Sequence, residues 1–194
     1  MKHVAITGGI GSGKSYVCQL LQRRGIRVYN CDMAAGGLIR ESESIRHALT
    51  ALVGEQLYAD GIFHKKLLSD YILSSDEARQ VVNNIVHPAV AEDFLASGME
   101  WLESAILFES NFHQRVHFDH VVCVTAPLEL RIRRLILRDQ ITRQKALEWI
   151  RCQMPQEEIL RRSDFEIIND EVCDLGQQID QLLEILGSLE RHEI

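Results

Sequence analysis

The chain has 194 residues, of which 46% are hydrophobic and 25% are charged, a composition expected of one soluble globular domain of ordinary size. A formal net charge of −7 excludes an overall positive field that would attract nucleic acid or an anionic membrane. We find no signal-peptide pattern and no apolar window of membrane-spanning length, and the five cysteines lack paired spacing, so we expect reduced thiols and a cytoplasmic location.

Short apolar runs of the strand type recur along the chain and alternate with helical patterns. The predicted strands are Val4–Ile6, Ile26–Tyr29, Ala105–Phe108, Val121–Val124 and Phe165–Ile168. Residues 121–124 are apolar at consecutive positions, as in a parallel strand that is covered on both faces. Apolar residues at helical spacing follow the first strand and lie near the C-terminus. This alternation predicts an α/β fold with a five-stranded, mostly parallel sheet.

One long interval, residues 33–99, interrupts this alternation and has mainly helical periodicity. Its apolar clusters lie at residues 49–53, 67–72 and 81–86. We expect His87-Pro88 to interrupt the helical pattern, because the residue before a proline is disfavoured in the α region. A crossover between parallel strands needs only one helix, so the interval is either an insert with its own function or additional core. A second helical stretch is predicted from about Pro127 to Arg162.

Residues 8–15, Gly-Gly-Ile-Gly-Ser-Gly-Lys-Ser, connect the first predicted strand to a helical pattern. Glycines at this density let backbone N–H groups converge on phosphate oxygens, and the N-terminus of the following helix adds its dipole. The spacing of Gly8, Gly13, Lys14 and Ser15 matches the phosphate-binding P-loop in full. In such a loop Lys14 reaches the β- and γ-phosphates and the Ser15 hydroxyl ligates Mg²⁺. The alternative is a glycine-rich turn that binds nothing.

A P-loop alone does not identify a reaction. GTPases need a guanine-reading Asn-Lys-x-Asp after a later strand, and nothing like it follows residues 121–124, where the chain continues Thr-Ala-Pro. Small-molecule kinases remain. They need a base beside the acceptor hydroxyl, a region that binds the acceptor, and cations over the transferred phosphate.

Asp32 is the candidate base. It stands just beyond the second predicted strand, at the edge of the sheet where parallel α/β proteins bind their ligands. The alternative is that Asp32 caps the helix that follows, because Asp is a preferred N-cap residue. The insert directly behind Asp32 is the expected acceptor-binding region.

The cations are expected from the helical segment Leu-Glu-Leu-Arg-Ile-Arg-Arg-Leu-Ile-Leu-Arg-Asp. On a helix Arg131, Arg134 and Arg138 fall within about 60° of one another, and no acid lies four residues away on their face. A solvated face is the ordinary explanation of such a stripe, but three unpaired guanidinium groups suit a triphosphate. We rank Arg138 first and Arg134 second.

Metal binding by the protein alone is not expected. The eight histidines are scattered without ligand spacing, so any metal should be Mg²⁺ that arrives with the nucleotide. Two interpretations of Glu109 stay open, namely that it orients water around Mg²⁺ or that it caps the turn that follows.

These segments together resemble the dephospho-CoA kinase family over nearly the whole chain. "AITGGIGSGKS" looks like the opening of that family, "YNCD" stands where the family has Asp-Ala-Asp, and "VHPAV" resembles its His-Pro segment. "ILFE", "RLILRDQIT", "QMPQEE" and "DFEIIN" follow in the same order and spacing. The first motif is shared by many P-loop kinases, whereas the full set is much more specific.

The resemblance implies ATP-dependent phosphorylation of the ribose 3′-hydroxyl of dephospho-CoA, the last step of coenzyme A synthesis, with ATP and dephospho-CoA as partners and Mg²⁺ as cofactor. It implies a P-loop kinase-type three-layer sandwich in three parts. The core comprises residues of about 1–32, 100–127 and 163–194, the helical acceptor (CoA) subdomain about 33–99, and the helical lid about 128–155.

The resemblance also assigns site residues. Asp32, Lys14 and Arg138 are expected to be catalytic, and Asp32 and His87 to bind the acceptor. The residues expected to bind ATP are Gly8, Gly9, Gly11, Ser12, Gly13, Lys14, Ser15, Tyr16, Arg134 and Asn169, of which Ser15 also ligates Mg²⁺.

This sequence departs from the family pattern at two functional positions. Asn30 replaces the first aspartate of Asp-Ala-Asp and removes a charge that could hold Mg²⁺ through water, and Tyr16 replaces a small hydroxyl residue. Two other functions stay open. One is a P-loop kinase of the nucleoside-monophosphate or shikimate type, and the other is a nucleotide-binding regulatory protein that has lost turnover.

Overall fold

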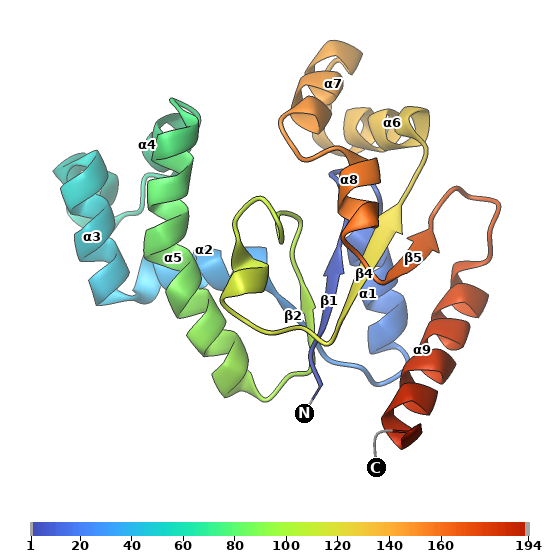
Figure 1. Ribbon diagram of the computed structural model, residues 1–194. Helices are drawn as coiled ribbons and strands as arrows, with labels where there is room; N and C mark the ends of the chain where they lie inside the picture. The colour runs from blue at the N-terminus through green and yellow to red at the C-terminus, as the bar shows by residue number, and fades with distance from the viewer. Residues whose placement is uncertain (1, 193–194) are drawn as a thin grey trace. The chain divides into compact units, whose positions relative to one another are not determined.

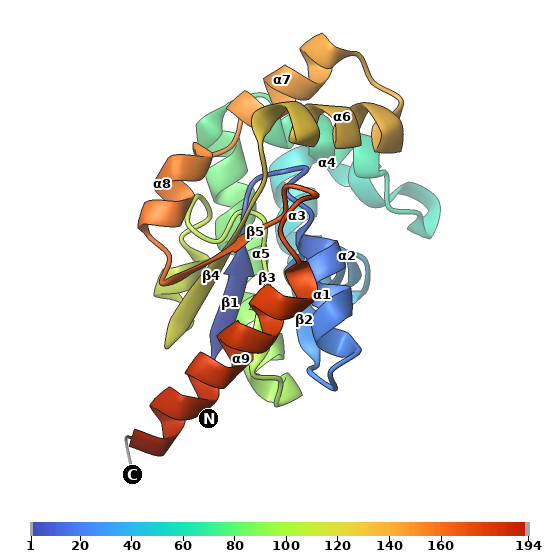
Figure 2. The ribbon, with the colours of Figure 1, turned by 90° about the vertical axis from the view of Figure 1, so that its right-hand side faces the viewer.

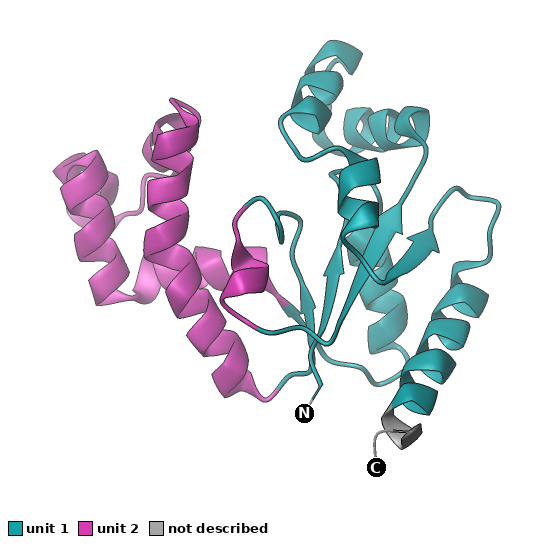
Figure 3. Ribbon diagram, in the orientation of Figure 1, with its two compact units in different colours: residues 1–29, 99–109, 117–194 teal, residues 30–98, 110–116 magenta. Residues whose placement is uncertain are grey.

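The structure, a computed structural model, describes residues 2–192, with side chains described to residue 189. The chain divides into two compact units (Figure 3). Unit 1 comprises residues 1–29, 99–109 and 117–194, and unit 2 comprises residues 30–98 and 110–116.

Unit 1 is built on one sheet of five strands in the order β2-β3-β1-β4-β5 (Figure 1). The strands are β1 (Val4–Thr7), β2 (Val28–Asn30), β3 (Trp101–Glu103), β4 (His120–Thr125) and β5 (Phe165–Ile168). β1 pairs in parallel with β3 and with β4, and β4 pairs in parallel with β5. Ile6 of β1 stands opposite Glu103 on one side and Val122 on the other. The prediction of a five-stranded parallel α/β sheet is confirmed.

Helices cover both faces of this sheet within unit 1. Figure 2 shows α1 and α9 on one side and α8 on the other, which gives the three layers that were predicted. Two further helices, α6 and α7, pack against each other. The bounds are α1 (Lys14–Gln22), α6 (Leu128–Asp139), α7 (Arg143–Arg151), α8 (Gln156–Arg161) and α9 (Leu175–His192). The predicted helical stretch from Pro127 to Arg162 is therefore three helices.

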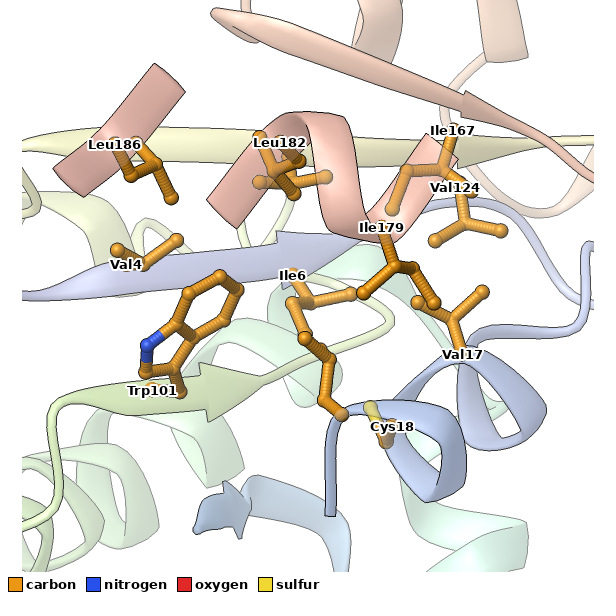
Figure 4. Close-up of a cluster of buried hydrophobic side chains, with 12 residues drawn as sticks. Val4, Ile6, Val17, Cys18, Trp101, Val124, Ile167, Ile179, Leu182 and Leu186 are labelled. Carbon is orange, nitrogen blue, oxygen red and sulfur yellow. The ribbon is translucent and has the colours of Figure 1, made fainter. Parts of the chain in front are cut away.

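The core of unit 1 lies between the sheet and the helix pair α1 and α9. Ile6 of β1, Val17 of α1 and Ile179 of α9 are fully buried there, and Figure 4 shows their side chains converging. The helical spacing of the apolar residues in α9 places one stripe on the sheet and leaves Ile185 exposed. This packing fixes α1, and with it the loop that precedes α1, against the end of β1.

The position of the third strand was predicted wrongly. The strand is Trp101–Glu103, whereas residues 105–110 form turns in which Leu107 and Phe108 are nevertheless buried. A short apolar run indicates burial, which a packed turn provides as well as a strand does. The real strand is only three residues long and ends in the buried, charged Glu103, so it has no apolar run to mark it.

Unit 2 is helical in the part of the chain that the structure describes. Its elements are α2 (Cys31–Glu41), α3 (Glu43–Val53), η1 (Glu55–Gly61), α4 (Lys65–Ile72), α5 (Asp76–Ser97) and η2 (Phe112–Gln114). The three apolar clusters predicted in the insert fall in α3, α4 and α5, and Leu49, Leu68 and Val82 are buried. α5 packs against α2, α3 and α4, so it is the central helix of this unit.

The expected interruption at His87-Pro88 was also wrong. Pro88 lies inside α5, which continues from Asp76 to Ser97. A proline lacks the N–H that would bond to the carbonyl four residues earlier, which is Asn84 here, and this loss bends a helix without necessarily ending it. Packing of α5 on its neighbours, with Val86 and Val90 buried on either side of the proline, offsets the missing bond.

The two faces of α9 give a matched test of the unit 1 core. Ile179 is fully buried, whereas Ile185 is 45% exposed. We expect Ile179→Ala to lower the free energy of unfolding by about 2–5 kcal/mol, because it removes a buried side chain and leaves a cavity. The control Ile185→Ala should lower it by about 1 kcal/mol or less. Urea unfolding of both variants measures the difference, and equal losses would contradict this description of the core.

Candidate active site

The loop at residues 8–13 leaves β1 and enters α1 with an unusual backbone. Gly8, Gly11 and Gly13 have φ values of +144°, +80° and +95°, which residues with a side chain rarely adopt. Gly13 is the N-cap of α1 and its carbonyl accepts hydrogen bonds from the N–H groups of Tyr16 and Val17. The first N–H groups of α1 therefore point toward the loop, as an anion-binding helix start requires.

Neighbouring groups press closely on the glycines of this loop. A Cβ at Gly8 would lie 2.3 Å from the Val124 carbonyl oxygen, and one at Gly9 would lie 2.3 Å from Arg131 Nη2. A Cβ at Gly13 would lie 2.0 Å from Asn169 Nδ2. Packing against the end of β4, helix α6 and the end of β5 thus requires glycine at these positions. This requirement is separate from the need for a bare backbone that a phosphate can approach.

Two of the four arginines of α6 bind this loop directly. Arg131 is only 4% exposed, and its Nε donates to the Ile10 carbonyl at 2.9 Å. Arg134 Nη1 donates to the carbonyls of Gly11 and Ser12 at 3.3 and 3.2 Å. Burial lowers the pKa of both guanidinium groups. The negative charge of Glu157 partly offsets this for Arg131, and that of Glu171 does so for Arg134. The loop is therefore backed by two positive charges that are partly removed from water.

Arg138, the arginine ranked first, lies at the surface and has no hydrogen bond to the loop among the described residues. Its side chain is 61% exposed and its guanidinium forms an ion pair with the adjacent Asp139, with Nη2 to Oδ2 at 2.8 Å. A helix-face pattern compares positions four residues apart and therefore does not include this adjacent acid. The structure brings Arg134 to the loop and leaves Arg138 at the surface, so the ranking of the two stays a prediction.

Asn169 joins three segments at the end of β5. It is 6% exposed, and its side-chain Nδ2 donates to the Ser12 carbonyl at 2.8 Å. Its Oδ1 accepts from Arg134 Nη2 at 3.0 Å, and its backbone N–H donates to the Thr125 carbonyl at 2.8 Å. The sequence predicted this residue as part of the ATP site, and the structure places it directly against the phosphate-binding loop.

Lys14 and Ser15 begin α1 beside the loop. Lys14 is 8% exposed and its Nζ donates to the Gly8 carbonyl at 2.8 Å. Ser15 and Tyr16 are exposed, whereas the buried hydroxyl of Ser12 has no hydrogen-bond partner among the described residues. Lys14 thus lies across the loop, where its ammonium group could exchange the carbonyl for a phosphate oxygen.

Glu103 is a buried carboxylate that the sequence did not single out. It is 4% exposed and stands at the end of β3, paired with Ile6 of β1. Desolvation raises the pKa of the nearby Cys18 thiol to about 12, and the negative charge of Glu103 adds to that rise while Lys14 opposes it. Glu103 and Lys14 therefore both lie within electrostatic range of Cys18 beneath the loop. A charged residue at the end of a strand would have indicated Glu103 from the sequence. The third strand was predicted at residues 105–108, so Glu103 was not recognised as a strand end.

The stretch "QMPQEE" holds the loop and the strand ends together. Gln153 Oε1 accepts from the Ile10 N–H at 2.6 Å, and Gln156 Oε1 accepts from the Ala126 N–H at 3.1 Å. Glu109 Oε1 accepts from the Met154 N–H at 3.0 Å. Glu109 therefore does not act as a cap of the turn that follows it, since this carboxylate oxygen accepts from a distant N–H, and the interpretation that it orients water around Mg²⁺ stays a prediction. Pairs this far apart along the chain leave no pattern in the local sequence.

Asn30 and Asp32 lie at the start of α2 in unit 2. Asn30 is the N-cap of α2, and its side chain accepts from the Met33 N–H at 2.8 Å. Asp32 lies in the first turn and is exposed. The alternative that Asp32 caps the helix is therefore wrong, because Asn30 performs that function and the Asp32 carboxylate stays available.

His87 lies in α5, also in unit 2. Its Nδ1 is buried without a hydrogen-bond partner among the described residues, and its ring packs edge-to-face on Phe112 with centroids 5.7 Å apart. Burial lowers the pKa of His87, and the positive charge of Arg115 lowers it further. The backbone of Ser110 and the charge of Asp32 act in the opposite direction. His87 is thus a partly buried group close to both Asp32 and Arg115.

Known proteins resemble this chain in sequence and in fold. A sequence model of the family described as dephospho-CoA kinase matches residues 2–174. The chain belongs to the dephospho-CoA kinase family. A relative from Bacteroides fragilis, named dephospho-CoA kinase, is 42% identical over 96% of this chain and 92% of its own.

Solved structures agree at the level of the fold. The crystal structure of TT1252 from Thermus thermophilus superposes with a TM-score of 0.79 at 29% identity and covers 97% of each chain. A shikimate kinase from Acinetobacter baumannii, at 15% identity, covers 97% of this chain and 94% of its own with a TM-score of 0.54. The predicted P-loop kinase fold is confirmed, and so is the predicted family.

The remaining expectations concern metals, membranes and thiols. Within residues 2–192 no group of three or more His, Cys, Asp or Glu side chains is arranged to hold a metal ion. In the same residues no helix is both long and apolar enough to cross a bilayer. All five cysteines are free thiols, of which Cys18, Cys31 and Cys123 are buried.

Two glycines with positive φ give a matched test of the loop. Gly13 and Gly25 have φ values of +95° and +83°, but only Gly13 has Asn169 in the space that a Cβ would occupy. We expect Gly13→Ala to weaken ATP binding at least about tenfold, because strain and the displacement of Asn169 together exceed about 1.4 kcal/mol. Gly25→Ala carries similar strain and should leave ATP affinity unchanged. Calorimetric titration of ATP measures both, and an unaffected Gly13→Ala protein would refute the described packing.

Proposed function

We propose that the protein is a dephospho-CoA kinase that transfers the γ-phosphoryl group of ATP to the ribose 3′-hydroxyl of dephospho-CoA, giving CoA and ADP. The observation that carries this proposal is the family match over residues 2–174, which includes a phosphate-binding loop with Lys14 and Ser15 intact. The same match disfavours a shikimate-type kinase, since such proteins share only the fold. A regulatory protein without turnover is disfavoured by the intact loop.

The ATP phosphates would lie in the loop at residues 8–13. Backbone N–H groups of Gly9, Gly11, Gly13 and the start of α1 would donate to phosphate oxygens, and Lys14 would leave the Gly8 carbonyl for the β- and γ-phosphates. Arg134 and Asn169 lie against the loop and would face the nucleotide. The remaining proposed ATP contacts come from Gly8, Ser12, Ser15 and Tyr16.

Mg²⁺ fits this site as a companion of ATP. No described cluster of acids could hold the ion alone, so its ligands would be phosphate oxygens, water and the exposed hydroxyl of Ser15. Glu103, buried at the end of the neighbouring strand, would accept hydrogen bonds from water on the metal. When bound, the ion neutralises charge on the β- and γ-phosphates.

Asp32 would act as the base. Its exposed carboxylate is not used as a helix cap, so it is available to accept the proton of the ribose hydroxyl during transfer. His87, near Asp32 in unit 2, would contribute to acceptor binding. In this proposal residues 33–99 form the acceptor subdomain, residues 128–155 form the lid, and the remainder is the core.

Lid arginines would supply charge to the transferred phosphate. Arg138 is exposed and, among the described residues, its guanidinium is held only by the neighbouring Asp139, so movement of α6 and α7 could bring it to the nucleotide. Arg134 already lies at the loop. We propose Arg138 as the arginine that contacts the transferred group and Arg134 as one that positions the loop and the nucleotide.

The choice of acceptor tests the proposed function. With ATP and Mg²⁺ present, we expect ADP release when dephospho-CoA is added, and no increase above the background hydrolysis of ATP with adenosine monophosphate or shikimate. Chromatographic detection of CoA identifies the product. Stronger turnover with either of the other acceptors would replace the proposal with that kinase activity.

Asp32→Asn tests the base. Asn is nearly isosteric but cannot accept the proton, so we expect a loss of roughly 10²- to 10⁴-fold in turnover with ATP affinity unchanged. Since Asn30 caps α2, helix stability should not change. The control Asp70→Asn alters an exposed carboxylate of the same unit that pairs with Lys66, and it should be nearly silent. Steady-state rates and an ATP titration measure both, and normal turnover of Asp32→Asn would refute the role.

A further inference from the structure

Three of the six lysine and arginine side chains in unit 2 have an electrostatic partner among the described residues. Lys66 pairs with Asp70, Arg79 pairs with Asp76, and Arg46 lies over the Tyr58 ring at 4.9 Å. Arg115 differs, because its guanidinium contacts a neutral amide and forms no ion pair within the described part of the chain. Its Nη2 donates to Asn84 Oδ1 at 2.9 Å. The position of this charge is therefore defined while the charge itself is not neutralised.

The backbone and the surrounding rings also hold Arg115 in place. Its N–H donates to the Phe112 carbonyl at 2.9 Å, and Phe112 is 1% exposed and packs edge-to-face on His87 of α5. Asn84, the amide that receives Arg115, lies one turn before His87 and also accepts from Gln80 Nε2 at 3.3 Å. Segment 110–116 is thus fixed to the middle of α5 through Phe112 and Arg115.

The same region contains the proposed base. Asp32 lies in the first turn of α2, which packs against α5. Charges of both Arg115 and Asp32 influence the pKa of His87, after burial as the main cause, so both groups lie close to that ring. Arg115 and Asp32 are exposed, whereas His87 Nδ1 is buried. A fixed cation and an available carboxylate thus lie on the same small surface of unit 2.

We propose that Arg115 is an acceptor-binding residue that contacts the diphosphate of dephospho-CoA while Asp32 faces the 3′-hydroxyl of the same ribose. The inference rests on the proposed function and names the group that selects the acceptor. It assigns Asn84 as a positioning residue, since the amide orients the guanidinium without neutralising it.

The chemistry of the acceptor matches this pair of groups. Dephospho-CoA carries its diphosphate on the 5′ carbon of the ribose whose 3′-hydroxyl is phosphorylated, so an anion and a reacting hydroxyl lie on one sugar. A guanidinium presents parallel N–H donors that suit a diphosphate, and it keeps several of its five donors free after one bond to Asn84. An acceptor without a charge at this point would leave Arg115 unsatisfied, which gives selectivity for diphosphate esters.

Kinetics of Arg115→Gln test the proposal, with Arg79→Gln on α5 as the matched control. We expect the KM for dephospho-CoA to rise about 10- to 100-fold in Arg115→Gln, as for the loss of one charged hydrogen bond, with kcat at saturation and the KM for ATP unchanged. Added salt should raise this KM less in the variant than in the wild type, because a charged contact is screened. Arg115→Lys should recover part of the affinity, and Arg79→Gln should resemble the wild type.

Two outcomes would overturn the proposal. One is a KM for dephospho-CoA in Arg115→Gln equal to that of Arg79→Gln. The other is a joint change in kcat and both KM values with a lowered melting temperature, which would show a structural role. Calorimetric titration of dephospho-CoA without ATP separates this inference from the proposed function. Binding that is weakened by Arg115→Gln supports the site even if the wild type forms no CoA, in which case the proposed function alone fails.

Discussion

A methyl group at Gly9 would lie 2.3 Å from Arg131, and one at Gly13 would lie 2.0 Å from Asn169. The phosphate-binding loop, helix α6 and the end of β5 can therefore pack together only if these positions carry no side chain. This close packing converts a flexible sequence into a defined backbone, because Arg131, Arg134 and Asn169 each donate to carbonyls of the loop. The N–H groups of Ile10 and Ser12 are also bonded within the protein, to Gln153 and to the Gly9 carbonyl, so the N–H groups that could serve a ligand are those of the loop glycines and the start of α1. The rest of unit 1, from the core under α1 to the parallel strand ends, keeps these partners in place.

Three cations, Arg131, Arg134 and Lys14, donate to carbonyls of this loop although the whole chain is negatively charged. The net charge is −7, yet Arg131 is 4% exposed behind the loop, and burial lowers the pKa of both Arg131 and Arg134. Arginine remains protonated at neutral pH even so, which means that the cost of partial desolvation is present in the folded protein. An anion bound in front of the loop would relieve part of that cost in a region of low dielectric. The overall charge thus carried no information about the charges that back the loop.

Features that depend on one stretch of chain were predictable, and features that depend on contacts between distant stretches were not. The loop at residues 8–15 and the helix behind it follow from local spacing, and so do α3, α4 and α9. Trp101–Glu103 was missed because a three-residue strand acquires its identity from pairing with β1 and not from its own composition. Gln153, 143 residues from Ile10, shows no local pattern that predicts its bond to the loop. Pro88 shows the same limit, since packing on neighbouring helices keeps α5 continuous through a residue that local rules place at a helix end.

Asn30 shows how a departure from a family pattern can be silent for the fold and still matter for chemistry. As the N-cap of α2 it accepts from the Met33 N–H, and Asn and Asp serve almost equally well in that position. Folding therefore places little constraint on the choice between them, and the lost carboxylate affects only what charge is presented near the helix start. Because Asn30 is the cap, the carboxylate of Asp32, two residues later, is not used as the N-cap of α2. Position 30 thus caps the helix, which Asn does as well as Asp, so Asn is tolerated there. Position 32 has the proposed role of base, which only a residue that can accept a proton could perform.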